Sequence, residues 1–133
     1  MIEHPMTRQV LFSHDELAAD DGTVRLAPGF QNALMDLRLT FGRPMRVTSC
    51  CRTPDHNRKV GGALSSFHLT SGNPLCLEGT CAIDIAIPDA SYLYLLTDKA
   101  VRAGWSIGVY KTFVHLDMRT LYGHPPVMWW GKP

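Results

Sequence analysis

The sequence predicts a single α+β domain, residues 1–133, in which N-terminal helices precede a mainly antiparallel sheet with one helix packed on it. Apolar residues recur at helical spacing in the first part of the chain, whereas short alternating and β-branched runs are typical of the rest. The chain has 133 residues, of which 45% are hydrophobic. A chain of this length buries roughly two-thirds of its unfolded surface, so it needs neither a disulfide nor a metal ion merely to fold.

Two helices are expected before the first strand. Ser13 and Glu16 form a capping-box pattern that opens a short helix, and the sequence Asp-Asp-Gly at 20–22 ends it. Pro28 suits the first turn of a longer helix, and Gly42 stops that helix. The apolar positions that repeat at helical spacing within it are Phe30, Leu34, Leu37 and Phe41.

Two further helices are expected, one on each side of a loop. The sequence Thr-Pro at 53–54 starts a short helix, and Gly-Gly at 61–62 closes it. A loop over 63–80 follows. Asp89 then leads into a helix at about 91–103. The side chains expected to face inward from this last helix are Tyr92, Leu95, Leu96 and Val101.

Strands are indicated where β-branched and apolar residues alternate in short runs. The expected strands are 45–50, 81–87, 106–110 and 113–119, with a tight turn at 111–112 between the last two. The tail, 120–133, is rich in Pro, Gly and Trp, so we expect it to be irregular. We expect Trp129 and Trp130 to cover the sheet.

Charge and hydropathy exclude several classes of protein. The net charge of +1 lacks the basic excess of a nucleic-acid-binding surface. No apolar run approaches the about 18 residues of a membrane span. The first residues, MIEHPMTRQV, contain no apolar segment of a secretory signal peptide, so we expect synthesis in the cytoplasm.

The four cysteines form no CxxC pair, which argues against a structural zinc site of the ribbon type. They are Cys50, Cys51, Cys76 and Cys81. The plain interpretation is that they are small buried residues. The alternative, in an oxidising compartment, is one disulfide that involves Cys76. The sequence does not assign its partner.

Alternation along the expected strands brings ionisable residues to one face of the sheet. In the run CAIDIAI, the isoleucines share the core face, and Asp84 points to the other face between two alanines. In the run FVHLDMR, the same rule puts His115 and Asp117 on one face. On neighbouring strands, Asp84 and His115 would lie side by side, and His68 in the preceding loop could close over them.

Two imidazoles and one carboxylate form a ligand set that suits Zn²⁺. Three protein ligands leave a fourth position for water, as in catalytic zinc sites, and zinc lowers the pKa of such a water to about 7. The chain has six histidines, and a histidine in a strand is more often structural than a ligand. The spacing alone therefore leaves both the zinc site and simple packing open.

Several short motifs follow one another along the chain. The run TSCCRTPDHNRKVGGALSSFH is followed by AIDIAI and then by FVHLD. In this order the motifs resemble the D-alanyl-D-alanine carboxypeptidase-like zinc peptidases, the peptidoglycan-cleaving relatives of lysostaphin-type enzymes and of the hedgehog domain. The resemblance covers a motif core of about residues 46–119, and the tail is similar to family tails. The matching positions are Ser49, Arg52, Thr53, Pro54, His56, Asn57, Gly61, Gly62, Ser66, His68, Ala82, Asp84, Val114, His115 and Asp117.

The resemblance implies a zinc ion on His68, Asp84 and His115. It also implies that Arg52 binds a carboxylate or carbonyl of the substrate, for which its planar guanidinium is suited. Ser66 would hold the same end of the substrate.

The motif match does not assign the general base. Many relatives have a Glu or His just before the last zinc ligand, and Phe113 stands there in this chain. Asp117 is the remaining candidate, because it shares a strand face with His115. The alternative is that Asp117 orients His115, as partners of zinc-bound histidines do. Both alternatives stay open.

The chain departs from the family pattern between the first two ligands. The family usually has six residues there, whereas fifteen residues, 69–83, separate His68 from Asp84. An inserted loop of this kind costs little free energy and does not exclude the site. It would lie beside the cleft and could alter specificity.

Three further polar residues are interpreted as structural rather than functional. We expect His56 and His124 to be structural or surface residues. Tyr110 is expected in the core or at a rim, although its hydroxyl could also serve an oxyanion.

These inferences predict a zinc metallopeptidase that hydrolyses an amide bond in the peptide part of bacterial peptidoglycan, as a D-Ala-D-Ala carboxypeptidase or an endopeptidase. The expected partner is a peptidoglycan peptide, and we expect a monomer. An endolysin-like lysis enzyme or a virion-associated enzyme of a phage, acting on the cell wall, fits these properties. The alternative is a non-catalytic, zinc-containing, cell-wall-binding module of the same fold. A third hypothesis is a structural phage protein whose histidines only pack.

Overall fold

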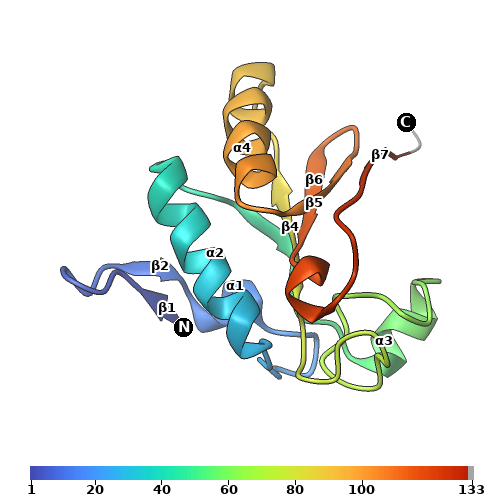
Figure 1. The fold of residues 1–133 in the computed structure, drawn as a ribbon. Coiled ribbons are helices and arrows are strands. Elements are labelled where there is room, and N and C mark those ends of the chain that lie inside the picture. The colour runs from blue at the N-terminus through green and yellow to red at the C-terminus, as the bar shows by residue number, and fades with distance from the viewer. Residues whose placement is uncertain (132–133) are drawn as a thin grey trace.

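A mainly antiparallel sheet organises the fold in the computed structural model, which describes residues 1–131 (Figure 1). Within these residues the sheet has five strands, and only the last pair is parallel. In spatial order the strands are β3 (Val47–Ser49), β4 (Ala82–Ala86), β6 (Phe113–Asp117), β5 (Ser106–Val109) and β7 (Met128–Trp130). The predicted α+β class with a mainly antiparallel sheet is confirmed.

The helices and a small hairpin complete the fold. The helices are α1 (His14–Leu17), α2 (Pro28–Phe41), α3 (Pro54–Lys59) and α4 (Ala90–Arg102), and a 3-10 helix, η1, covers Arg119–Tyr122. The hairpin consists of β1 (Ile2–Glu3) and β2 (Val10–Phe12) and was not predicted. Two of the predicted helix ends are confirmed in atomic detail. Ser13 and Glu16 form the capping box of α1, and Gly42 ends α2 in the left-handed region at φ 74°.

One face of the sheet is the hydrophobic core, and α2 and α4 pack against each other over it (Figure 1). Ile83 and Ile85 of β4 point into this core with no exposed surface, as do Val114 and Leu116 of β6. The strand alternation predicted for the two runs is therefore confirmed. Their polar side chains stand on the opposite, open face, where α3 and the long loops lie beside the sheet.

Two predictions are only partly right. The tail is irregular at 124–127, but η1 and β7 form on either side, and β7 pairs in parallel with β5. The last two residues of the predicted tail, 132–133, lie outside the described residues. Leu95 and Val101 do not face inward from α4, since they are 43% and 57% exposed. Tyr92 and Leu96 are buried as predicted, and with Ala100 they follow one another at a spacing of four.

The cysteines follow the plain interpretation, because all four are free and buried. Among residues 1–131, no helix combines the length and the apolar character needed to cross a membrane.

Candidate metal centre

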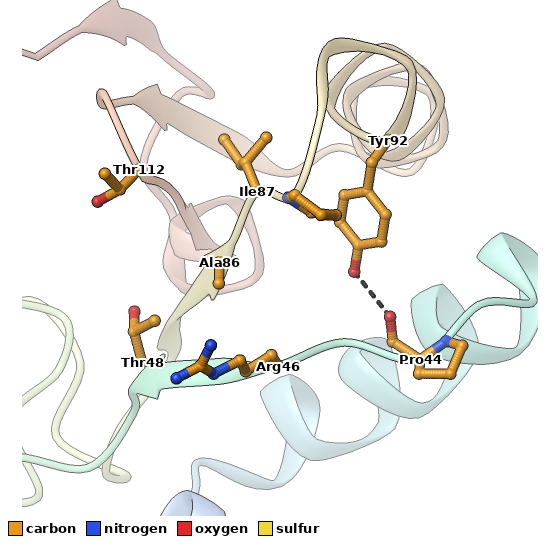
Figure 2. A pocket seen from close by; sticks show the side chains of 8 residues that line it. Pro44, Arg46, Thr48, Ala86, Ile87, Tyr92 and Thr112 are labelled. Carbon is orange, nitrogen blue, oxygen red and sulfur yellow. Dashed lines mark hydrogen bonds between the residues drawn. The ribbon is translucent and has the colours of Figure 1, made fainter.

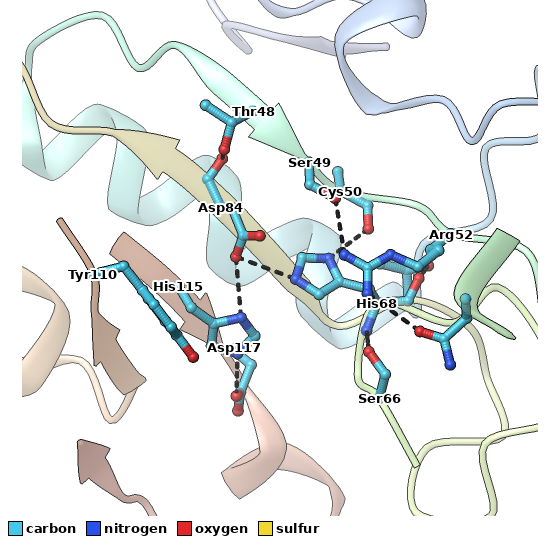
Figure 3. A network of polar contacts seen from close by, with 12 residues as sticks. Thr48, Ser49, Cys50, Arg52, Ser66, His68, Asp84, Tyr110, His115 and Asp117 are labelled. Atoms are coloured by element: carbon cyan, nitrogen blue, oxygen red, sulfur yellow. Dashed lines mark hydrogen bonds and ion pairs between the residues drawn. The ribbon is translucent and has the colours of Figure 1, made fainter. Parts of the chain in front are cut away.

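Three side chains of metal-ligand type meet on the open face of the sheet (Figure 3). His115 of β6 lies directly opposite Asp84 of β4 in the antiparallel register. Its Nδ1 atom is 3.1 Å from Asp84 Oδ1, and His68 Nε2 is 3.2 Å from the same oxygen. The structure thus brings together His68, Asp84 and His115, the three residues predicted as ligands.

His68 comes from a loop, and backbone contacts fix its place. The Arg52 N–H donates a hydrogen bond to the His68 carbonyl over 2.8 Å, and the Thr80 hydroxyl donates to the same carbonyl over 2.9 Å. These bonds attach the loop to the end of β3 and to the segment that enters β4. The ring is consequently held although no regular element carries it.

The outer nitrogen of each imidazole has an acceptor. His68 Nδ1 lies 2.7 Å from the Cys50 carbonyl oxygen, and His115 Nε2 lies 2.8 Å from Asp117 Oδ2. A carbonyl oxygen and a carboxylate oxygen only accept, so these outer nitrogens carry the N–H protons. In neutral rings, the inner nitrogens then carry lone pairs, and both point at a carboxylate oxygen.

Three electron-pair donors that converge in this way fit a cation. The ligand atoms all lie within 4.8 Å of one another. Ligand atoms at about 2.0–2.2 Å from a tetrahedral zinc ion are roughly 3.3 Å apart, which is close to the two distances from Asp84 Oδ1. An outer hydrogen bond on each histidine is also usual for zinc ligands. The donor set therefore fits Zn²⁺.

Without metal, a proton on an inner nitrogen takes the place of the cation, and that nitrogen then donates a hydrogen bond to Asp84. Burial raises the pKa of Asp84, but hydrogen bonds from His115 and His68 outweigh burial and hold that pKa well below its usual range. Burial lowers the pKa of His115, but its bonds to Asp117 and Asp84 outweigh burial and raise the pKa. The site thus holds an ionised carboxylate that attracts positive charge.

Asp117 is fully buried and has both carboxylate oxygens occupied. Oδ2 accepts from His115 and from Arg119 Nη2, the latter over 2.7 Å. Oδ1 accepts from Arg119 Nε over 2.9 Å and from the Arg119 backbone N–H over 3.1 Å. Burial raises the pKa of Asp117, but the bonds from Arg119 and His115 outweigh burial and lower it. This geometry favours the orienting alternative for Asp117, because no oxygen is left to face a water in the cleft.

The metal-ligand side chains line an open cleft of about 470 Å³. Arg52 and Ser66 line it on the side of His68. Arg52 bonds to Asn57 Oδ1 over 3.2 Å and to Ser49 Oγ over 3.4 Å. Within residues 1–131 it has no carboxylate partner, so its charge is available to a ligand.

The inserted loop lies beside the cleft, as expected. Leu75 lines the cleft, and His124 from the tail donates from Nε2 to the Leu75 carbonyl over 3.1 Å. Asn73 is fully buried and anchors the loop through a 3.1 Å bond to the Ser66 carbonyl. The insert is thus a structured part of the cleft wall.

Sequence reasoning missed several supporting residues. Asn57 is 3% exposed and links α3 both to Arg52 and to the Ala63 carbonyl. A side chain at Gly62 would overlap the Asn57 amide, which explains the glycine. Both residues belong to the motif pattern, so a signal was present. Arg119 is not one of the motif positions, so nothing in the sequence singled it out.

Other candidates lie outside the metal centre. His56 pairs with Asp20 over 3.1 Å on the surface. A second cavity of about 430 Å³ is lined by Arg46, Thr48 and Tyr92, whose hydroxyl bonds to the Pro44 carbonyl (Figure 2). Among the described residues its lining includes neither a histidine nor a carboxylate, so it does not resemble a metal site.

The fold and the site define a protein with a candidate catalytic metal centre at the base of an open cleft. A family model described as Peptidase M15 matches residues 9–117. The chain therefore belongs to the peptidase M15 family of D-Ala-D-Ala carboxypeptidase-like zinc peptidases, and the resemblance inferred from the motifs is confirmed. No curated protein sequence matches the chain.

Proposed function

We propose that the protein is a zinc-dependent peptidase, active as a monomer, that hydrolyses an amide bond in the peptide part of bacterial peptidoglycan. The reaction is of the D-Ala-D-Ala carboxypeptidase or endopeptidase type. The observation that carries the proposal is the convergence of His68 Nε2, His115 Nδ1 and Asp84 Oδ1 on one open cleft, with both outer nitrogens fixed. Membership of the peptidase M15 family supports the substrate class.

The chain's own residues have separate roles in this proposal. A zinc ion held by the three ligands supplies a Lewis acid that activates water near neutral pH and polarises a carbonyl. Arg52 binds a substrate carboxylate or carbonyl, which places the scissile bond over the centre. Ser66 assists at the same end of the substrate. Asp117 holds the His115 ring with its Nδ1 toward the metal.

The cell wall is the proposed place of action, because the substrate class is peptidoglycan. The protein would be made in the cytoplasm and act on the wall after release, or as part of a virion. An endolysin-like phage enzyme fits this route.

A non-catalytic zinc-containing binding module is the second candidate. One observation favours it: Phe113, at the position of an expected base, lines the cleft and cannot accept a proton. Its ring stacks on Tyr110 with the centroids 4.6 Å apart, so it serves packing.

Digestion of purified sacculi by the zinc-loaded protein tests the proposal. We expect mass spectrometry to detect released fragments that identify the cleaved bond. His68→Ala and Asp84→Ala should abolish release and lower the bound zinc, whereas His4→Ala, in the N-terminal hairpin, should change neither. One equivalent of zinc without any cleavage would support the binding module, and a protein that purifies and refolds without affinity for zinc would refute both candidates.

A further inference from the structure

Tyr110 is held rigidly at the wall of the cleft. Its ring stacks on Phe113 with an interplanar angle of 5°. A side chain at Gly131 would overlap the Tyr110 ring, so the backbone of that glycine packs directly against the ring. The Gly131 N–H donates to the Val109 carbonyl over 2.7 Å, which fixes this contact. The position of the Tyr110 hydroxyl is therefore well defined.

The proton of this hydroxyl is free for a ligand. Trp129 donates its ring N–H to the Tyr110 oxygen over 3.0 Å. Because an indole N–H can only donate, the hydroxyl acts as the acceptor and keeps its own proton. Within residues 1–131, this bond is the only one that the hydroxyl makes.

Trp129 is itself fixed by the sheet. It lies beside Gly108 in the parallel pairing of β5 with β7, and a side chain at Gly108 would overlap the indole ring. The Trp129 ring centroid is 5.3 Å from that of His115. The strand that replaces the expected irregular tail thus places an N–H donor where it orients Tyr110.

Tyr110 and Arg52 flank the metal-ligand side chains. Both line the same cleft. Figure 3 shows Tyr110 next to His115 and Arg52 beyond His68, with Asp84 between the two histidines. A substrate that reaches Arg52 across the centre therefore passes the Tyr110 hydroxyl.

We propose that Tyr110 is a catalytic residue whose hydroxyl donates a hydrogen bond to the scissile carbonyl oxygen while water adds to the carbonyl carbon. The hydroxyl keeps its proton, and the bond strengthens as negative charge develops on the oxygen. A preorganised donor stabilises this charge more than it stabilises the neutral carbonyl, so it lowers the barrier. The inference rests on the proposed peptidase function.

Tyr110→Phe tests this inference, because it keeps the stacked ring and removes only the O–H. We expect kcat on a peptidoglycan peptide to fall about 100-fold, as for the loss of one oxyanion donor, with KM and zinc content nearly unchanged. Tyr94→Phe is the matched control, since Tyr94 lies on α4 and is 73% exposed. An equal kcat in wild type and Tyr110→Phe would overturn the inference.

Trp129→Phe tests the orienting contact separately. It removes the N–H but retains an aromatic ring, so we expect a smaller fall in kcat. If Trp129 acts through Tyr110, the double variant Tyr110→Phe/Trp129→Phe should be no slower than Tyr110→Phe alone. Additive losses would refute this link.

Binding of a phosphinic peptide separates this inference from the proposed function. Its tetrahedral, anionic centre imitates the charge that develops during hydrolysis, and binding needs no turnover. We expect calorimetry to show at least a tenfold weaker affinity for Tyr110→Phe than for wild type, both loaded with zinc. Wild type that cleaves no peptide would contradict the peptidase, whereas equal affinities of the two proteins would overturn the role of Tyr110.

Discussion

Replacing Asp117 with Asn tests how the metal centre is supported. The Asp117 carboxylate accepts four hydrogen bonds, one from His115 and three from Arg119. An asparagine amide has a single oxygen, so in either orientation its NH₂ group faces two donors. The variant keeps the shape of the side chain and loses about half of these bonds.

The expected losses of stability and of zinc affinity follow from the burial and charge of Asp117. Asp117 is fully buried, and breaking a buried charged pair costs about 3–5 kcal/mol of unfolding free energy. Loss of a partner that orients a metal-bound histidine typically weakens metal affinity by about 10- to 100-fold. We therefore expect Asp117→Asn to be less stable in urea and to bind zinc at least tenfold more weakly.

Competition with a chromophoric chelator measures the zinc affinity. Asp98→Asn is the matched control, because Asp98 pairs with Arg102 on the exposed face of α4 and should contribute at most about 1 kcal/mol. If Asp117 served only as the general base, the variant would lose kcat while the dissociation constant for zinc stayed within about twofold of wild type. That result would refute the orienting role.

Further predictions concern metal removal, the hydrophobic core and the contact that supports Arg52. Chelation of the zinc-loaded protein should lower Tm. Free zinc at about 100 times its dissociation constant adds roughly 2.7 kcal/mol to the free energy of unfolding. An unchanged Tm would mean that zinc does not bind the folded state preferentially. Ile83→Ala should cost about 2–5 kcal/mol in urea unfolding, whereas Val101→Ala should change stability by no more than about 0.5 kcal/mol; equal effects would contradict the observed packing of α4. Gly62→Ala should displace the Asn57 amide and with it Arg52. We therefore expect kcat/KM to fall roughly 10- to 100-fold at constant zinc affinity. An unchanged kcat/KM would show that the position of Arg52 does not depend on this contact.

Strand alternation predicted the part of the site that depends on local geometry. Because side chains alternate with a period of two, the runs around Asp84 and His115 were enough to place both residues on one face of the sheet. Their exact pairing in neighbouring strands required only that the two runs be adjacent. The convergence of His68 came from the motif order, since periodicity gives no information about a loop.

Long-range contacts explain what the sequence did not reveal. Trp129 reaches Tyr110 only because β7 adds in parallel to β5, and no local pattern in the tail indicates that pairing. The inward face of α4 was misassigned at Leu95 and Val101, because apolar residues also occupy its exposed side. Sequence periodicity cannot decide which apolar stripe of such a helix meets the sheet.

The hydrogen-bond acceptors that orient the two imidazoles differ in whether a mutation can remove them. His115 is oriented by a side chain, Asp117, which a single base change can replace. His68 is oriented by the main-chain carbonyl of Cys50, which is present whatever residue occupies that position. For the proposed metal site, evolution or protein engineering can therefore tune metal affinity through β6, while the contribution of the loop stays constant as long as its backbone keeps its course.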